Sequence, residues 1–326
     1  MRRAVLPWVA ATLILVLASV AGISLASGTL FTATAFVRVY LDALARGDGA
    51  AAAAMPGVVS SGAGGTLVTA ADAMPGLDRI RVVSDAEVAP GRHRISVAWR
   101  SGGRIQGESA VTVERAGTTA LVFPAWRFAT PPTASLAPAL RGDDRVAVGA
   151  RTFEVRPGAA LRVLVPGAYA VRMRSPVAQS DARPAVADRP GSVLRVRLTG
   201  RATPAFLARI EAQVRSALDA CARQQVLYPR GCPFGAAITD RIASTPQWTI
   251  LARPRIRLSP TDRPDAWRAS VSSGTARLRV DVRSLFDGTV APRNEDAVIS
   301  GAWAVSVAGD TPRLGALIDA GGQRAS

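Results

Sequence analysis

The chain has 326 residues and a formal net charge of +16, and all 40 of its basic residues are arginine. A basic chain that contains no lysine indicates a bias in the coding sequence, so charge alone does not identify a ligand. Aromatic residues make up only 5% of the chain. There is a single histidine, His93, so any Ser/His/Asp or Cys/His catalytic relay would have to use this one position.

The first strong pattern is an apolar run of 23 residues, Ala4–Ala26, preceded by Arg2 and Arg3. A helix of this length spans a hydrocarbon core of about 30 Å. Arginines on its N-terminal side favour a cytoplasmic N-terminus and an extracytoplasmic position for the rest of the chain. Residues 1–28 are therefore predicted to be a short cytoplasmic stub and a single transmembrane helix. The alternative is a signal peptide cleaved near Ala26, which would leave a secreted protein.

Residues 29–130 show a helical pattern followed by alternating strands. Apolar residues at three- and four-residue spacing predict a helix that ends near Gly47, and Ala50–Ala54 predicts a second short helix. A period of two then predicts antiparallel strands, with a hairpin turn at Gly102-Gly103. The helical positions are Phe31, Val37, Tyr40, Leu41 and Leu44, and the strands are Ile80–Val88, His93–Arg100, Gln106–Glu114 and Thr119–Arg127. This order predicts an α+β module.

The stretch FVRVYLDALARGDGAAAAAMPG and the closing WRF at Trp126–Phe128 resemble NTF2-like, cystatin-like cone folds, which occur as extracytoplasmic modules in bacteria. The resemblance implies a cone formed by a helix and a curved sheet. In such folds the cone can host isomerase or hydrolase chemistry.

Residues 131–202 are predicted to form a small β-sandwich after a linker marked by Pro131-Pro132 and Pro138. Short strands are separated by Pro-Gly turns, and the predicted strands are Val146–Val155, Ala160–Val165, Ala168–Arg174 and Ser192–Leu198. The stretch LVPGAYAVRM resembles strands of envelope β-domains, including those of the TcaA family of membrane-anchored proteins.

Residues 203–320 repeat the layout of helix first and strands afterwards. Thr203-Pro204 is a typical helix start, and the helix leads to Cys221. The predicted strands are Trp248–Leu258, Ala266–Ser272, Thr275–Leu285 and Val298–Val307. A second α+β module is therefore expected, followed by a disordered tail over 321–326. The stretch LDACARQQVLYPRGCPFG resembles uncharacterised actinobacterial single-pass membrane proteins.

Cys221 and Cys232 are the two cysteines, and an oxidising compartment predicts a disulfide between them. Their spacing is not that of a CxxC redox pair, and they have no histidine nearby for zinc. No metal and no cofactor is expected. His93 is interpreted as a solvated surface residue, and the pairs Asp143-Asp144 and Glu295-Asp296 as turn residues in loops.

Alternating arginines give the best functional lead. Arg253, Arg255 and Arg257 are predicted to share one face of a strand. Arg277, Arg279 and Arg283 share a face of another, interrupted by Asp281. If these strands are neighbours, one sheet face could hold phosphate or carboxylate groups bidentately. The alternative is an ordinary solvated face in an arginine-biased chain.

The function that these patterns favour is a non-enzymatic, membrane-anchored extracytoplasmic protein that binds an anionic wall polymer or another envelope protein. An extracytoplasmic position argues against nucleic acid as the partner. One alternative is an NTF2-like enzyme of isomerase or hydrolase type, which needs ionisable residues converging in the cone. The other is a structural spacer.

Overall fold

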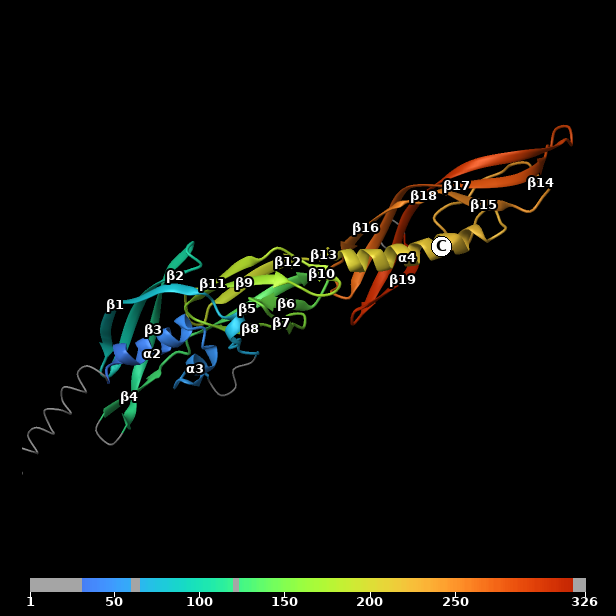
Figure 1. Ribbon diagram of the computed structural model, residues 1–326. Coiled ribbons are helices and arrows are strands. Elements are labelled where there is room, and N and C mark those ends of the chain that lie inside the picture. The colour runs from blue at the N-terminus through green and yellow to red at the C-terminus, as the bar shows by residue number, and fades with distance from the viewer. Residues whose placement is uncertain (1–30, 60–64, 120–122, 319–326) are drawn as a thin grey trace, which may run out of the picture. The chain divides into compact units, whose positions relative to one another are not determined.

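The computed structural model describes residues 31–59, 65–119 and 123–318 (Figure 1). The predicted anchor over Ala4–Ala26 and the predicted tail over 321–326 lie outside the described residues. Within the described ranges, no helix combines the length and the apolar character needed to cross a bilayer.

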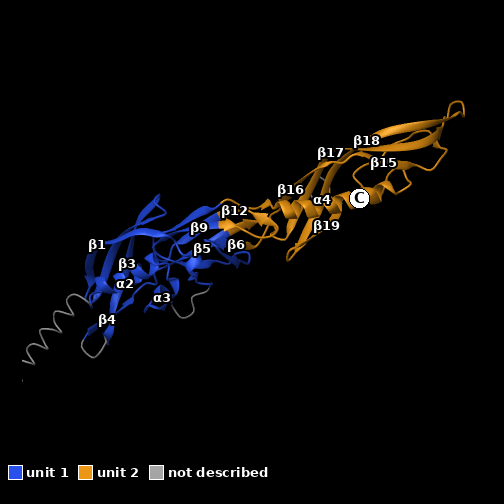
Figure 2. Cartoon of the chain, viewed as in Figure 1, with its two compact units in different colours: residues 1–138, 147–171, 182–196 blue, residues 139–146, 172–181, 197–326 orange. Residues whose placement is uncertain are grey.

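The chain divides into two compact units, each drawn from three stretches of sequence (Figure 2). Unit 1 contains residues 1–138, 147–171 and 182–196, and unit 2 contains residues 139–146, 172–181 and 197–326. The sequence predicts three consecutive modules after the anchor instead. The predicted module over 29–130 and most of the predicted sandwich over 131–202 belong to unit 1.

Unit 1 begins with helix α2 (Ala33–Ala45), which is capped by the hydroxyl of Thr32 at 3.0 Å from the amide of Ala35. Its apolar stripe is buried, as the spacing predicts, with Val37, Tyr40, Leu41 and Leu44 all at 2% exposure or less. Asp48 caps the short helix α3 (Gly49–Ala54), and a single 3₁₀ turn, η1 (Ala71–Ala73), follows.

Four antiparallel strands then form a meander, in the order β1 (Leu77–Ala89), β2 (Arg92–Ser101), β3 (Ile105–Thr119) and β4 (Phe123–Phe128). Gly102 and Gly103 both have positive φ in the β2–β3 turn, as the predicted hairpin requires. The inward side chains of β2, among them Ile95, Val97 and Trp99, form one buried core with those of α2. The prediction of helices combined with antiparallel sheets is confirmed.

The predicted linker is not a linker, because Thr133–Arg141 forms strand β5. Pro131 and Pro132 precede the strand, and Pro138 follows the four residues that pair with the neighbouring strand β8 (Leu161–Leu164). The prolines therefore do not interrupt that ladder. The phenolic oxygen of Tyr40 on α2 donates to the carbonyl of Val165 at 2.8 Å, which ties this segment to the helix.

The remaining strands of this part are short. Strand β5 is central in a sheet of order β12-β5-β8, and a second sheet has the order β11-β9-β6-β7. The predicted strand over Val146–Val155 is two strands, because the chain turns at Gly149. The bounds are β6 (Arg145–Val148), β7 (Arg151–Glu154), β9 (Gly167–Met173), β11 (Arg183–Ala187) and β12 (Val193–Thr199), with β10 (Ala178–Gln179) paired to β13 (Arg201–Ala202).

Unit 2 is built from helix α4 (Pro204–Ala222) and a six-stranded antiparallel sheet. Thr203 caps α4 and Pro204 occupies its first turn, as predicted. Strand β17 is central: β18 and then β19 lie on one side, while β14, β15 and β16 pair in succession along its other side. The bounds are β14 (Arg241–Ile242), β15 (Gln247–Ala252), β16 (Arg255–Pro260), β17 (Ala266–Arg283), β18 (Val290–Ala308) and β19 (Thr311–Ile318).

Two expectations for this unit are corrected. The predicted strands Ala266–Ser272 and Thr275–Leu285 are one continuous strand, because the chain passes through Ser272-Ser273 by a bulge instead of a turn. Glu295 and Asp296 do not lie in a loop, since both pair with residues of β17 inside strand β18.

Candidate functional site

The sheet of unit 2 has one covered face and one open face, and a bulge in β17 keeps the apolar side chains of this strand on the covered face. Before it the buried residues are Trp267, Ala269 and Val271, and after it they are Ala276, Leu278, Val280 and Val282. The register shift lies between Val271 and Gly274, where Ser273 has a φ of 61°. Because one extra residue reverses the alternation of a strand, the bulge keeps apolar side chains on the same face throughout. The opposite face carries the arginines.

The strand register brings two of the predicted sets together on this open face. Arg255 and Arg257 of β16 lie opposite Ser272 and Ser270 of β17. Further along β17, Arg279 lies opposite Asn294 of β18 and Gln247 of β15. We call the set Arg255, Arg257, Arg277, Arg279 and Arg283 the arginine face.

Three members of the arginine face have free guanidinium groups. Arg255, Arg257 and Arg279 are exposed, and within the described part of the chain no hydrogen bond or ion pair engages them. Their strand neighbours named above are neutral polar side chains, so no carboxylate faces them across the ladder. Free cations on alternate positions are available to an external anion.

The other two members are already engaged. Arg277 donates from Nε and Nη2 to the carboxylate of Asp296, at 2.6 and 2.8 Å. This fork raises the pKa of Arg277 and lowers that of Asp296. Arg283 donates to the carbonyl of Gly288 at 3.4 Å. Asp296 and the partly buried Asp281 offset part of the positive charge of this face, and Arg241 of β14, opposite Arg283, adds to it.

Arg253 does not join this face, which corrects the prediction that Arg253, Arg255 and Arg257 lie together. Strand β15 ends at Ala252 and β16 begins at Arg255, so Arg253 lies in the connection between them. Its guanidinium contacts Asp219 of helix α4 at 3.2 Å, on the covered side of the sheet. A break of two residues between strands resets the alternation on which the prediction depended.

The arginine face follows the length of strand β17. From Ser270, opposite Arg257, to Arg283 the strand covers about 40 Å at about 3.3 Å per residue, and alternate residues are about 6–7 Å apart. Such a surface matches repeating anionic groups along a polymer more closely than it matches one small molecule.

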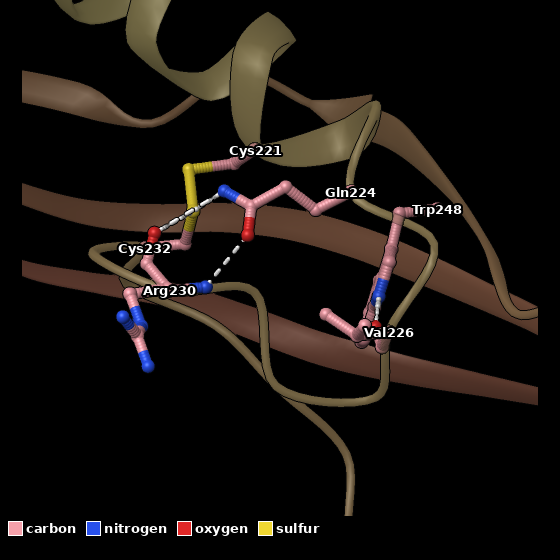
Figure 3. The surroundings of a disulfide bond; sticks show 6 residues. All are labelled: Cys221, Gln224, Val226, Arg230, Cys232 and Trp248. Atoms are coloured by element: carbon pink, nitrogen blue, oxygen red, sulfur yellow. Dashed lines mark hydrogen bonds between the residues drawn. A yellow bond between two sulfur atoms is a disulfide. The ribbon is translucent and has the colours of Figure 1, made fainter.

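The disulfide predicted between Cys221 and Cys232 is confirmed (Figure 3). It joins the end of α4 to the following turn, with the two Cα atoms 5.8 Å apart. Gln224 crosses the same loop, accepting from the amide of Arg230 at 2.8 Å and donating to its carbonyl at 3.2 Å. The indole nitrogen of Trp248 donates a hydrogen bond to the carbonyl of Val226 at 2.8 Å. These contacts fix the segment that covers the inner face of the sheet.

His93 is more engaged than a solvated residue. Its Nδ1 lies 2.7 Å from Asp85, whose other oxygen accepts from Thr34 at 2.5 Å, and its ring packs edge-on against Trp126 at 5.2 Å. The carboxylate lies between the hydroxyl and the imidazole. Since a nucleophile relay needs the hydroxyl bonded to the imidazole, this arrangement is not one.

Asp143 lies in the connection between β5 and β6, as the sequence predicts, and its carboxylate accepts from the amide of Arg145 two residues on, but the side chain is also buried in a larger network. It is 3% exposed and accepts from the backbone and side chain of Arg145 and from Ser175. Arg145 extends the network to Asp310 at 2.6 Å. Burial by itself raises the pKa of Asp143, but the bonds from Arg145 and Ser175 bring that pKa below its usual value. No sequence signal brings Ser175 and Asp310 into this network, because both are far in the chain from Asp143 and Arg145.

Comparison with known proteins does not identify a family for this chain. The sequence matches no protein-family model and no curated protein. A solved structure described as an Ntf2 like protein involved in plasmid conjugation matches at 12% identity, over 75% of this chain and 78% of the other. Its TM-score is 0.17, which is too low to carry an argument about this chain.

Proposed function

We propose that this chain is a non-enzymatic binding protein of the cell envelope that holds an anionic polymer on the arginine face of unit 2. In this proposal the run Ala4–Ala26 anchors the chain in the membrane and both units lie outside the cytoplasm. The polymer carries phosphate or carboxylate groups at regular intervals.

The observation that carries the proposal is the free guanidinium groups of Arg255, Arg257 and Arg279 on one open sheet face. On the same face Arg277 is engaged by Asp296, whereas no hydrogen bond or ion pair engages these three within the described residues. A free, alternating set on rigid strands is preorganised for bidentate contact with oxyanions.

Two features support the extracytoplasmic position. The run Ala4–Ala26 has the length and flanking charge of an anchor. The disulfide between Cys221 and Cys232 is typical of an oxidising compartment. In intact cells, both cysteines should resist maleimide labelling until a reductant is added. Labelling of the unreduced protein would contradict an extracytoplasmic position.

The NTF2-like character is part of the same proposal and applies to the helix and sheet of unit 1. In an enzyme of this fold, the space between helix and sheet would hold converging ionisable groups. Here Val37, Tyr40, Leu44, Val97 and Trp99 belong to one buried cluster that runs from α2 to the sheet. That packing favours a binding role over isomerase or hydrolase chemistry.

The test is binding of the purified full-length protein, in detergent, to polyphosphate and to polyglutamate at about 0.1 M salt. The variant R255Q/R257Q/R279Q removes three free cations. Exposed ion pairs contribute about 0.2–1 kcal/mol each, so affinity should fall by about 3- to 150-fold. The matched control R156Q/R183Q/R195Q removes the same charge from exposed positions of unit 1 and should retain affinity for the polymer. Equal losses in both variants would refute a specific face.

A further inference from the structure

Unit 1 carries a second feature that sequence patterns do not reveal: two arginines directly opposite each other on its sheet. Arg79 of β1 pairs in register with Arg100 of β2, and Arg100 pairs in turn with Gln106 of β3. Like charges at directly opposed positions destabilise a sheet unless something neutralises them. Within the described ranges, neither guanidinium has an ion pair or a hydrogen bond.

The Nε atom of Arg100 strengthens this observation. It is buried from solvent and has no hydrogen-bond partner within the described ranges. A buried donor without an acceptor carries a desolvation cost, and most such groups in folded proteins are satisfied. An oxyanion between the two arginines would accept from their outer guanidinium nitrogens and cancel the repulsion.

The surrounding surface is hollowed in the same place. A concavity of about 1060 Å³ is lined by Arg79, Arg100 and Gln106, together with Arg81, Glu108 and Asp78, whose carboxylate accepts from the amide of Gly103. Its floor lies at Ala98, which is opposite both Arg81 and Glu108 in the ladder. A small side chain on the central strand, flanked by long charged ones, produces this hollow. The concavity therefore has a subsite for an anion at one end.

We propose that this concavity binds a small polar ligand through a carboxylate or phosphate group held between Arg79 and Arg100. Glu108 lies two residues along β3 from Gln106, which places it about 6–7 Å further along the concavity. Its carboxylate has no partner within the described ranges, so it accepts from a hydroxyl or ammonium group at the other end of the ligand. The ligand class is thus an oxyanion with a hydrogen-bond donor a few bonds away, such as an amino acid, a short peptide or a sugar acid.

Ligand binding in the concavity is tested by calorimetric titration of the full-length protein with inorganic phosphate, acetate and glycylglycine at constant ionic strength. Binding of phosphate alone assigns a phosphate ligand, and binding of acetate and glycylglycine assigns a carboxylate ligand. R100Q should weaken every probe that binds by at least 10-fold. R94Q is the matched control, since Arg94 is an exposed arginine on the same face of β2, six residues away. It should leave affinity unchanged.

Two further measurements separate a ligand site from a structural arginine pair. Without a probe, R100Q should melt at the wild-type temperature or above it, because the repulsion is relieved. If a carboxylate binds, E108Q should weaken glycylglycine at least 5-fold and leave acetate unaffected. The proposal is overturned if no probe binds, if R94Q weakens binding as much as R100Q, or if R100Q lowers the melting temperature. Polymer binding on the arginine face is measured separately, so either proposal can fail alone.

Discussion

Asn in place of Asp143 should destabilise unit 2 more than its single-atom change suggests. The carboxylate accepts three bonds from Arg145 at 2.8–2.9 Å and one from Ser175 at 2.6 Å. An amide offers one oxygen and turns its NH₂ group toward donors. Removing one partner of a buried ion pair costs about 3–5 kcal/mol. The lower end applies because Arg145 is 19% exposed and keeps its bond to Asp310. The expected loss is about 3 kcal/mol.

Urea unfolding of D143N followed by circular dichroism measures this loss at pH 7. The pKa of Asp143 is lowered in the folded state, so its contribution to stability is complete above the ordinary carboxyl pKa of about 3.9. The contribution is lost as the pH falls through the lower, folded value. Wild type and D143N should therefore differ by a constant amount from pH 5 to 8, and the difference should begin to shrink as the pH falls below about 4.

Asp262 provides the matched control, because it also pairs with an arginine, Arg141, but its side chain is 88% exposed. Exposed pairs contribute about 0–1 kcal/mol, so D262N should be close to wild type. The reasoning fails if D143N lies within about 0.5 kcal/mol of wild type at pH 7, or if the difference between them persists unchanged at pH 3.

Replacing Cys221 and Cys232 together by alanine should lower the free energy of unfolding by about 3 kcal/mol through loop entropy, or the melting temperature by about 6–12 °C. Dithiothreitol should lower the melting temperature of the wild type by the same amount and leave that of the variant unchanged. A variant as stable as the wild type would contradict the estimate. Tyr40→Phe should cost about 1–2 kcal/mol in urea unfolding, because the fully buried carbonyl of Val165 loses its donor. Tyr228→Phe, at a position that is 64% exposed, is its control, and an equal effect of the two would contradict the assignment.

Local patterns predicted the elements of this protein well. The apolar spacing of Val37, Tyr40, Leu41 and Leu44 gave helix α2, and Thr203-Pro204 gave the start of α4. These predictions succeed because burial of one helical face and capping depend on neighbours in sequence.

Predictions that depended on distant contacts were less successful. Proline at 138 suggested a linker, although β5 pairs with β8 before that residue is reached. Alternation placed Arg253 with Arg255, and only the end of β15 separates them. The bulge after Val271, which keeps Arg277 and Arg279 on the open face, has no sequence signature strong enough to predict it. Nothing in the sequence indicates that Arg79 and Arg100 face each other.

The division of the chain into interleaved stretches has a consequence for how the protein is made. Residues 139–146 and 172–181 belong to unit 2, but they are synthesised before unit 1 is complete at residue 196. At about 5–20 residues per second, they wait on the order of 10 s for the rest of their unit to emerge. No single cut in the chain releases either unit whole. A truncation after residue 196 would retain residues 139–146 and 172–181 without the rest of unit 2, so such a fragment should aggregate under conditions in which the full chain does not.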